Sequence, residues 1–132
     1  MRTTLVTTSA AALALGLLTL AVPTASAQGG GGVVRASGSC SASTDWKLKA
    51  KPADSRLEIE FQVDSNVSGQ TWAVKITDNG ARVFAGTRMT AGPSGSFSVD
   101  RKIADRAGAD TLVATAMNAM TGETCRGSLM LG

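Results

Sequence analysis

The sequence predicts an all-β fold, an antiparallel β-sandwich of seven or eight short strands closed by one disulfide. Three observations lead to this prediction. From Val33 onward, apolar and polar residues alternate at period two in short runs, as in strands that bury one face. Gly, Pro, Asn and Asp separate these runs at regular spacing, and no segment has a helical period. Short strands of this kind in about 100 residues are typical of a β-sandwich.

Residues 1–27 are expected to be a cleaved signal peptide. Arg2 supplies the positive charge, the stretch from Ala10 to Val22 is almost wholly apolar, and residues 25–27 (Ala-Ser-Ala) are the small residues of a cleavage site. A transmembrane anchor needs ~20 apolar residues, and Pro23 ends the run short of that length. The working protein is therefore expected to be secreted and extracellular, with no membrane attachment after cleavage.

Residues 28–32 predict a flexible Gly-rich leader, and residues 33–132 a single β-sandwich domain. Removing the signal leaves 132 − 27 = 105 residues, which suits one domain. This remainder has no His, no Tyr and five aromatic residues, two Trp and three Phe. Without His, a Ser-His-Asp relay and a His-ligated zinc are excluded. We therefore expect no enzyme activity, no metal and no cofactor.

Cys40 and Cys125 are the two cysteines of the chain. In an exported protein, an even pair of cysteines predicts a disulfide, and two cysteines allow one pairing. A redox-active pair usually has the spacing C-x-x-C, which this pair lacks. We expect a structural bridge that joins the first strand to the last.

Eight segments have the alternating pattern of strands. They are Val33–Cys40, Asp45–Lys51, Arg56–Asp64, Gln70–Asp78, Arg82–Arg88, Ser96–Arg101, Thr111–Asn118 and Cys125–Leu131.

The second and third segments are expected to form a hairpin with residues 52–55 as its turn. Pairing residues whose numbers sum to 107 places apolar pairs on one face and Lys–Glu pairs on the other, as cross-strand stabilisation requires. The apolar pairs are Trp46 with Phe61, Leu48 with Ile59 and Ala50 with Leu57, and the ionic pairs are Lys47 with Glu60 and Lys49 with Glu58.

A second hairpin is indicated by Asp78, Asn79 and Gly80, but two registers are open. A two-residue turn would pair Ile76 with Val83 and leave Phe84 outside. A bulge at Gly80 would pair Val74 with Phe84 and turn the ring inward. We favour the bulge, because it removes more apolar area from water.

Four segments resemble a group of small secreted actinobacterial proteins of unassigned activity: Trp46–Lys51, Thr77–Gly80, Pro93–Phe97 and Thr121–Cys125. The resemblance covers the whole mature chain and implies an immunoglobulin-like sandwich, an extracellular location and no site residues. The enediyne-binding apoproteins and the subtilisin-inhibitor family carry two disulfides, so the single cysteine pair departs from both.

Three groups of polar or sulfur-bearing residues are candidate sites. Glu58 and Glu60 could be a glycosidase pair, but each is expected to face a Lys, which favours structural ion pairs. Calcium could be held by Asp100, Asp105 and Asp110, although interleaved basic residues favour solvated turns. Copper(I) or a binding partner could contact Met117, Met120 and Met130, although ordinary packing is favoured.

Two further candidates concern recognition of other molecules. Trp46 and Trp72 could stack on sugar rings as in a carbohydrate-binding module, but each shares a face with apolar residues and is expected in the core. The segment Thr87–Pro93 could present Arg88 or Met89 to a protease, but no local disulfide braces it.

The charge of the mature chain, 12 − 10 = +2, is too small and too evenly spread to indicate nucleic acid. Lys47, Lys49 and Lys51 form the one basic stripe, and residues 66–68 (Asn-Val-Ser) match a glycosylation sequon. The sequence therefore predicts a secreted, monomeric, non-enzymatic binding or structural protein whose partner is an unknown extracellular protein or glycan. The alternatives are a carbohydrate-binding module and a secreted protease inhibitor.

Overall fold

The computed structural model describes residues 32–132, so the predicted signal peptide (1–27) and residues 28–31 of the predicted leader lie outside the described residues. All eight predicted strands are present with small shifts at their ends, and no helix occurs between residues 32 and 132. The strands are β1 (Val34–Ser39), β2 (Asp45–Ala53), β3 (Arg56–Asp64), β4 (Thr71–Asp78), β5 (Ala81–Met89), β6 (Ser96–Ala104), β7 (Asp110–Asn118) and β8 (Thr124–Leu131).

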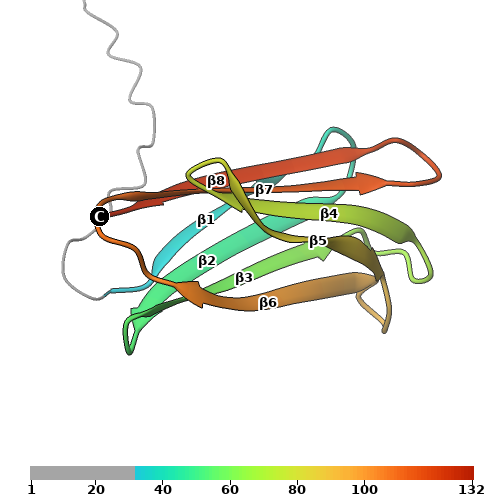
Figure 1. The fold of residues 1–132 in the computed structure, drawn as a ribbon. Coiled ribbons are helices and arrows are strands. Elements are labelled where there is room, and N and C mark those ends of the chain that lie inside the picture. The colour runs from blue at the N-terminus through green and yellow to red at the C-terminus, as the bar shows by residue number, and fades with distance from the viewer. Residues whose placement is uncertain (1–31) are drawn as a thin grey trace, which may run out of the picture.

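The strands form two antiparallel four-stranded sheets (Figure 1). Sheet A has the order β1-β2-β3-β6, and sheet B has the order β5-β4-β7-β8. The inward residues of both sheets form one apolar core, as the period-two alternation predicts. Trp72 and Phe97 meet across the core with ring centroids 6.4 Å apart.

In the hairpin of β2 and β3, the predicted register is wrong by two residues. Paired residues sum to 109, so Trp46 faces Val63 and Leu48 faces Phe61. The turn is only Asp54-Ser55, and both residues adopt positive φ, 51° and 61°. A shift of two keeps every side chain on its predicted face, so the apolar pattern cannot distinguish the two registers. The left-handed two-residue turn determines which one forms, because its twist matches that of the strands.

The hairpin of β4 and β5 combines features of the two predicted registers. Asn79 and Gly80 form a two-residue turn with positive φ, 49° and 84°. The bulge lies further along, between Ile76 and Thr77, and it pairs Ile76 with Phe84. The favoured pairing of Val74 with Phe84, and a bulge at Gly80, are therefore wrong.

Phe84 turns inward at the open edge of the sandwich and is half-buried there. Two guanidinium groups cover its ring, since the Cζ atoms of Arg88 and Arg101 lie 4.9 Å and 5.4 Å from the ring centroid. This stack closes the side where β5 and β6 approach each other.

The predicted bridge between Cys40 and Cys125 is present. Cys40 directly follows β1, and Cys125 lies in β8, so the bridge ties an edge strand of sheet A to an edge strand of sheet B. The disulfide closes one side of the sandwich, and the Phe84 stack closes the other.

Candidate functional site

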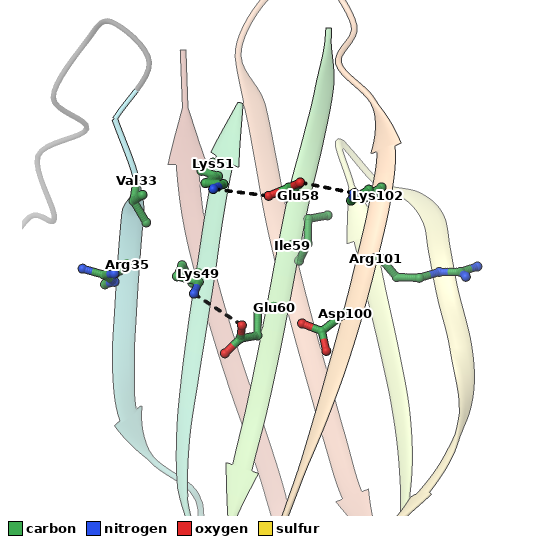
Figure 2. A pocket seen from close by; sticks show the side chains of 10 residues that line it. All are labelled: Val33, Arg35, Lys49, Lys51, Glu58, Ile59, Glu60, Asp100, Arg101 and Lys102. Atoms are coloured by element: carbon green, nitrogen blue, oxygen red, sulfur yellow. Dashed lines mark ion pairs between the residues drawn. The ribbon is translucent and has the colours of Figure 1, made fainter. Parts of the chain in front are cut away.

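The outer face of sheet A carries lysines and glutamates that form ion pairs between neighbouring strands. Lys49 Nζ lies 3.3 Å from Glu60 Oε2, and Glu58 lies 3.5 Å from both Lys51 and Lys102. Figure 2 shows these ion pairs, which link side chains of neighbouring strands along a hollow of 570 Å³ on this face. The two acids weighed as a glycosidase pair are therefore both held by lysines. Their partners differ from the predicted ones because of the two-residue register shift.

The outer face of sheet B is very different, and we name it the threonine face. Its charged residues are Lys75, Arg82 and Arg126, and no carboxylate side chain belongs to it. Sixteen outward positions make up the face: Thr71, Ala73, Lys75 and Thr77 on β4; Arg82, Ala85, Thr87 and Met89 on β5; Thr111, Val113, Thr115 and Met117 on β7; Thr124, Arg126, Ser128 and Met130 on β8.

A hollow of 380 Å³ lies on the threonine face over β4, β7 and β8. The register places Lys75, Thr115 and Arg126 in one row across these strands. Lys75 and Arg126 thus lie on either side of Thr115, on two strands that are about 10 Å apart, which is two strand spacings. Ala73 and Met117 add apolar surface in the next row. The hollow therefore combines two cations with an apolar wall.

Met89, Met117 and Met130 are exposed on this face, and Met120 is exposed in the turn after β7. The favoured expectation of ordinary packing for Met117, Met120 and Met130 is therefore wrong. The exposed fractions of Met89, Met117 and Met130 are 61%, 49% and 62%. Met130 pairs with Thr111, at the end of β8 far from Met117, so ~20 Å of strand separates them. A single copper site cannot include both residues. Met89 was considered only as a residue of the inhibitor segment and not for this face, because the predicted strand ended one residue before it.

The two Trp residues lie in the core, as expected from their strand faces. Trp46 is 9% exposed and Trp72 is fully buried, so neither offers a platform for sugar stacking. The proposed inhibitor segment is also not a convex loop. Thr87, Arg88 and Met89 belong to β5, and the next residue, Thr90, is buried and bonded through its hydroxyl to the Val67 carbonyl.

Of the three aspartates considered for calcium, Asp105 and Asp110 lie close to each other, and Asp100 does not belong to this pair. Asp100 lies on the outer face of sheet A and Asp105 in the loop after β6. Asp110, expected to be a solvated turn residue, is instead only 4% exposed. Burial and the nearby carboxyl of Asp78 raise the pKa of Asp110 to about 6. Within residues 32–132, no group of three His, Cys, Asp or Glu side chains could hold a metal ion.

Sequence reasoning overlooked Asp78 as the partner of Asp110. The signal was available, because Asp78 stands two residues after the buried Ile76 and thus shares its inward face. Asp78 is 7% exposed, and its Oδ1 has no hydrogen-bond partner among the described residues.

At the opposite end of the sandwich, Glu123 ties two loops together. Its carboxylate accepts hydrogen bonds from the Thr44 hydroxyl at 2.7 Å, the Thr44 amide at 3.0 Å and the Ala42 amide at 3.0 Å. Burial alone raises the pKa of Glu123, but these hydrogen bonds outweigh burial and lower the pKa below its usual value. The carboxylate thus has a structural role beside a second hollow of 380 Å³, which is separate from the one on the threonine face and is also lined by Ser41 and Ser65.

The chain matches no known protein-family model, no curated protein and no solved structure. Between residues 32 and 132, no helix is long and apolar enough to cross a membrane.

Proposed function

We propose that this chain is an exported, non-enzymatic binding protein that docks an extracellular partner on its threonine face. The observation that carries the proposal is the contrast between the two sheets. Sheet A pairs its central acids with lysines, whereas the threonine face has exposed Met side chains and no acid.

The composition of the threonine face supports docking. Protein interfaces are enriched in Met and Arg and depleted of Glu and Asp relative to other surfaces. Met side chains also adapt to a partner, because they are unbranched and polarisable. A face of four strands and about eight residues per strand measures ~20 Å by ~25 Å, or ~500 Å², which approaches one side of a standard interface.

Export is supported by the disulfide, since such bridges persist in oxidising compartments. A non-enzymatic role is supported by the absence of His and by the structural roles of the carboxylates. Glu58 and Glu60 hold lysines, and Glu123 holds Thr44.

The strand order supports an immunoglobulin-like architecture. If β1 is set aside, β2, β3 and β6 correspond to strands A, B and E of that architecture. The other sheet, β5-β4-β7-β8, then corresponds to C′-C-F-G. The same architecture is implied by the resemblance to small secreted actinobacterial proteins. The bridge differs from the B–F disulfide of antibody domains, because it joins two sheet edges.

The proposal is tested by blocking each face with an uncharged side chain. Ala73→Gln fills the hollow of the threonine face, and Ser98→Gln places the same side chain on the outer face of sheet A. The immobilised mature protein is exposed to extracellular and cell-envelope proteins of the organism that produces it. We expect the wild type and Ser98→Gln to retain a partner that Ala73→Gln does not retain. Equal retention by both variants would place binding elsewhere.

A further inference from the structure

Building on the proposed docking function, we infer that the threonine face recognises an acidic protein segment, which places carboxylates against Lys75, Arg82 and Arg126. The inference follows from an imbalance of charge. Among the described residues, none of these three cations forms an ion pair, whereas five charged side chains on sheet A are paired with one another.

The three cations form a band across the strands. Arg82 pairs with Thr77 on β4, and Lys75 lies two residues before Thr77 on the same face. Arg126 lies level with Lys75, two strands away. From β5 to β8 the band thus spans about 14 Å, three strand spacings. It crosses the hollow between Lys75 and Arg126.

Charge complementarity argues against a second copy of this chain as the occupant. Two threonine faces pressed together would bring six cations and no acid into one interface, and like charges brought together this way cost several kcal/mol. A partner with Asp and Glu side chains would neutralise the band.

The chemistry beside the band favours a protein segment over an anionic polymer alone. The rows next to Lys75 hold Ala73 and Met117 on one side and Val113 on the other. An acidic peptide can cover these apolar rows with its own apolar side chains, while a sulfated glycan has none to offer. Apolar contacts would supply affinity, and the cations would supply orientation and on-rate.

The test uses poly-L-glutamate as the probe and the complete mature protein, with binding measured by fluorescence anisotropy at low salt. The double variant Lys75→Gln/Arg126→Gln removes two cations of the band. The matched control, Arg35→Gln/Lys47→Gln, removes two exposed cations of sheet A that form no ion pair among the described residues. Thermal unfolding verifies that both variants fold.

We expect the threonine-face variant to bind poly-L-glutamate at least about tenfold more weakly, with a shallower dependence on salt. The sheet A variant should bind within about twofold of the wild type, a difference under 1 kcal/mol. Equal losses in the two variants would overturn the inference, because binding would then depend on net charge alone.

Dextran sulfate and phosphatidylglycerol vesicles are tested in parallel. Tighter binding to either probe than to poly-L-glutamate, lost in the same double variant, would overturn the assignment to an acidic protein. The outcome is separable from the docking proposal. If Ala73→Gln loses the natural partner and Lys75→Gln/Arg126→Gln retains it, docking on the threonine face is supported. The inference that the partner is acidic is then contradicted.

Discussion

Gly127 on β8 lies directly against the indole ring of Trp46 on β2. A Cβ at residue 127 would be 2.5 Å from Cζ3 of that ring, and a Cβ at Gly38 would be 3.0 Å from its Cζ2. The ring therefore fits between two strands that both lack side chains at these points. Space, and not backbone conformation, requires glycine at these two positions.

Gly127→Ala should destabilise the fold by about 1–3 kcal/mol, because the added methyl overpacks a site where the ring cannot retreat. Chemical denaturation followed by Trp fluorescence measures the change. Ser128→Ala, at the neighbouring outward position, should stay within about 0.5 kcal/mol of the wild type. An unchanged midpoint for Gly127→Ala would show that the ring has room to move.

Replacing both cysteines, Cys40→Ala and Cys125→Ala, should lower stability by about 2–5 kcal/mol. The bridge closes a loop with a sequence separation of 85, so its removal frees most of the chain in the unfolded state. Urea denaturation of the oxidised protein and the double variant measures the difference. Free-thiol titration of the wild type should find none, and two reactive thiols would contradict the bridge.

Asp110→Asn should stabilise the protein at pH 7 by about 1–3 kcal/mol. The pKa of Asp110 rises from 3.8 to about 6 on folding, so the folded state holds more protons than the unfolded state between these values. Stability of the wild type therefore falls as pH rises through this window. Above pH 6 both states are ionised, and the cost of the buried charge remains constant.

The measurement for Asp110 is unfolding free energy from pH 3 to pH 8. The advantage of Asp110→Asn over the wild type should vanish near pH 3 and reach its maximum above pH 6. Asp100→Asn is the control, because Asp100 is exposed on sheet A. A constant difference between wild type and Asp110→Asn at every pH would contradict the raised pKa.

Glu123→Gln should cost about 1–2 kcal/mol at pH 7, because the carboxylate accepts three hydrogen bonds that an amide cannot reproduce equally. The pKa of Glu123 is lowered, so its stabilisation is present above the unfolded value of 4.5 and is lost as pH falls through the folded value. Denaturation at pH 7 and pH 2.5 checks this prediction. The gap between wild type and variant should narrow at the lower pH.

Alternation predicted the strands and the inward faces well, because one-sided burial imposes a period of two. The pairing register of the two hairpins was harder to predict from the sequence. The turn at Asp54 and Ser55 and the bulge beside Ile76 depend on local backbone geometry, and a shift of two residues leaves every face unchanged. Faces can thus be predicted from a sequence where pairings cannot.

The candidate site could be predicted only in part from the sequence, because it too depends on strand pairing. Ordinary packing was favoured for Met117, Met120 and Met130, and that expectation is wrong, because all three side chains are exposed. The separation of Met117 from Met130 depends on the strand direction and register. The absence of acids on the threonine face became visible only after four strands, distant in sequence, were assigned to one sheet. Asp78 and Asp110 were likewise recognised as neighbours only once β4 paired with β7.

The bridge between Cys40 and Cys125 also determines how the molecule would bear mechanical tension. The start of β1 and the end of β8 lie at the same end of the sandwich (Figure 1), and the bridge lies at the other end of these two strands. A pull on the flanking segments could peel away residues 32–39 and 126–132 before the load reached the covalent link. Residues 41–124 lie inside the closed loop and would carry no load, so most of the threonine face would keep its shape while the molecule was stretched.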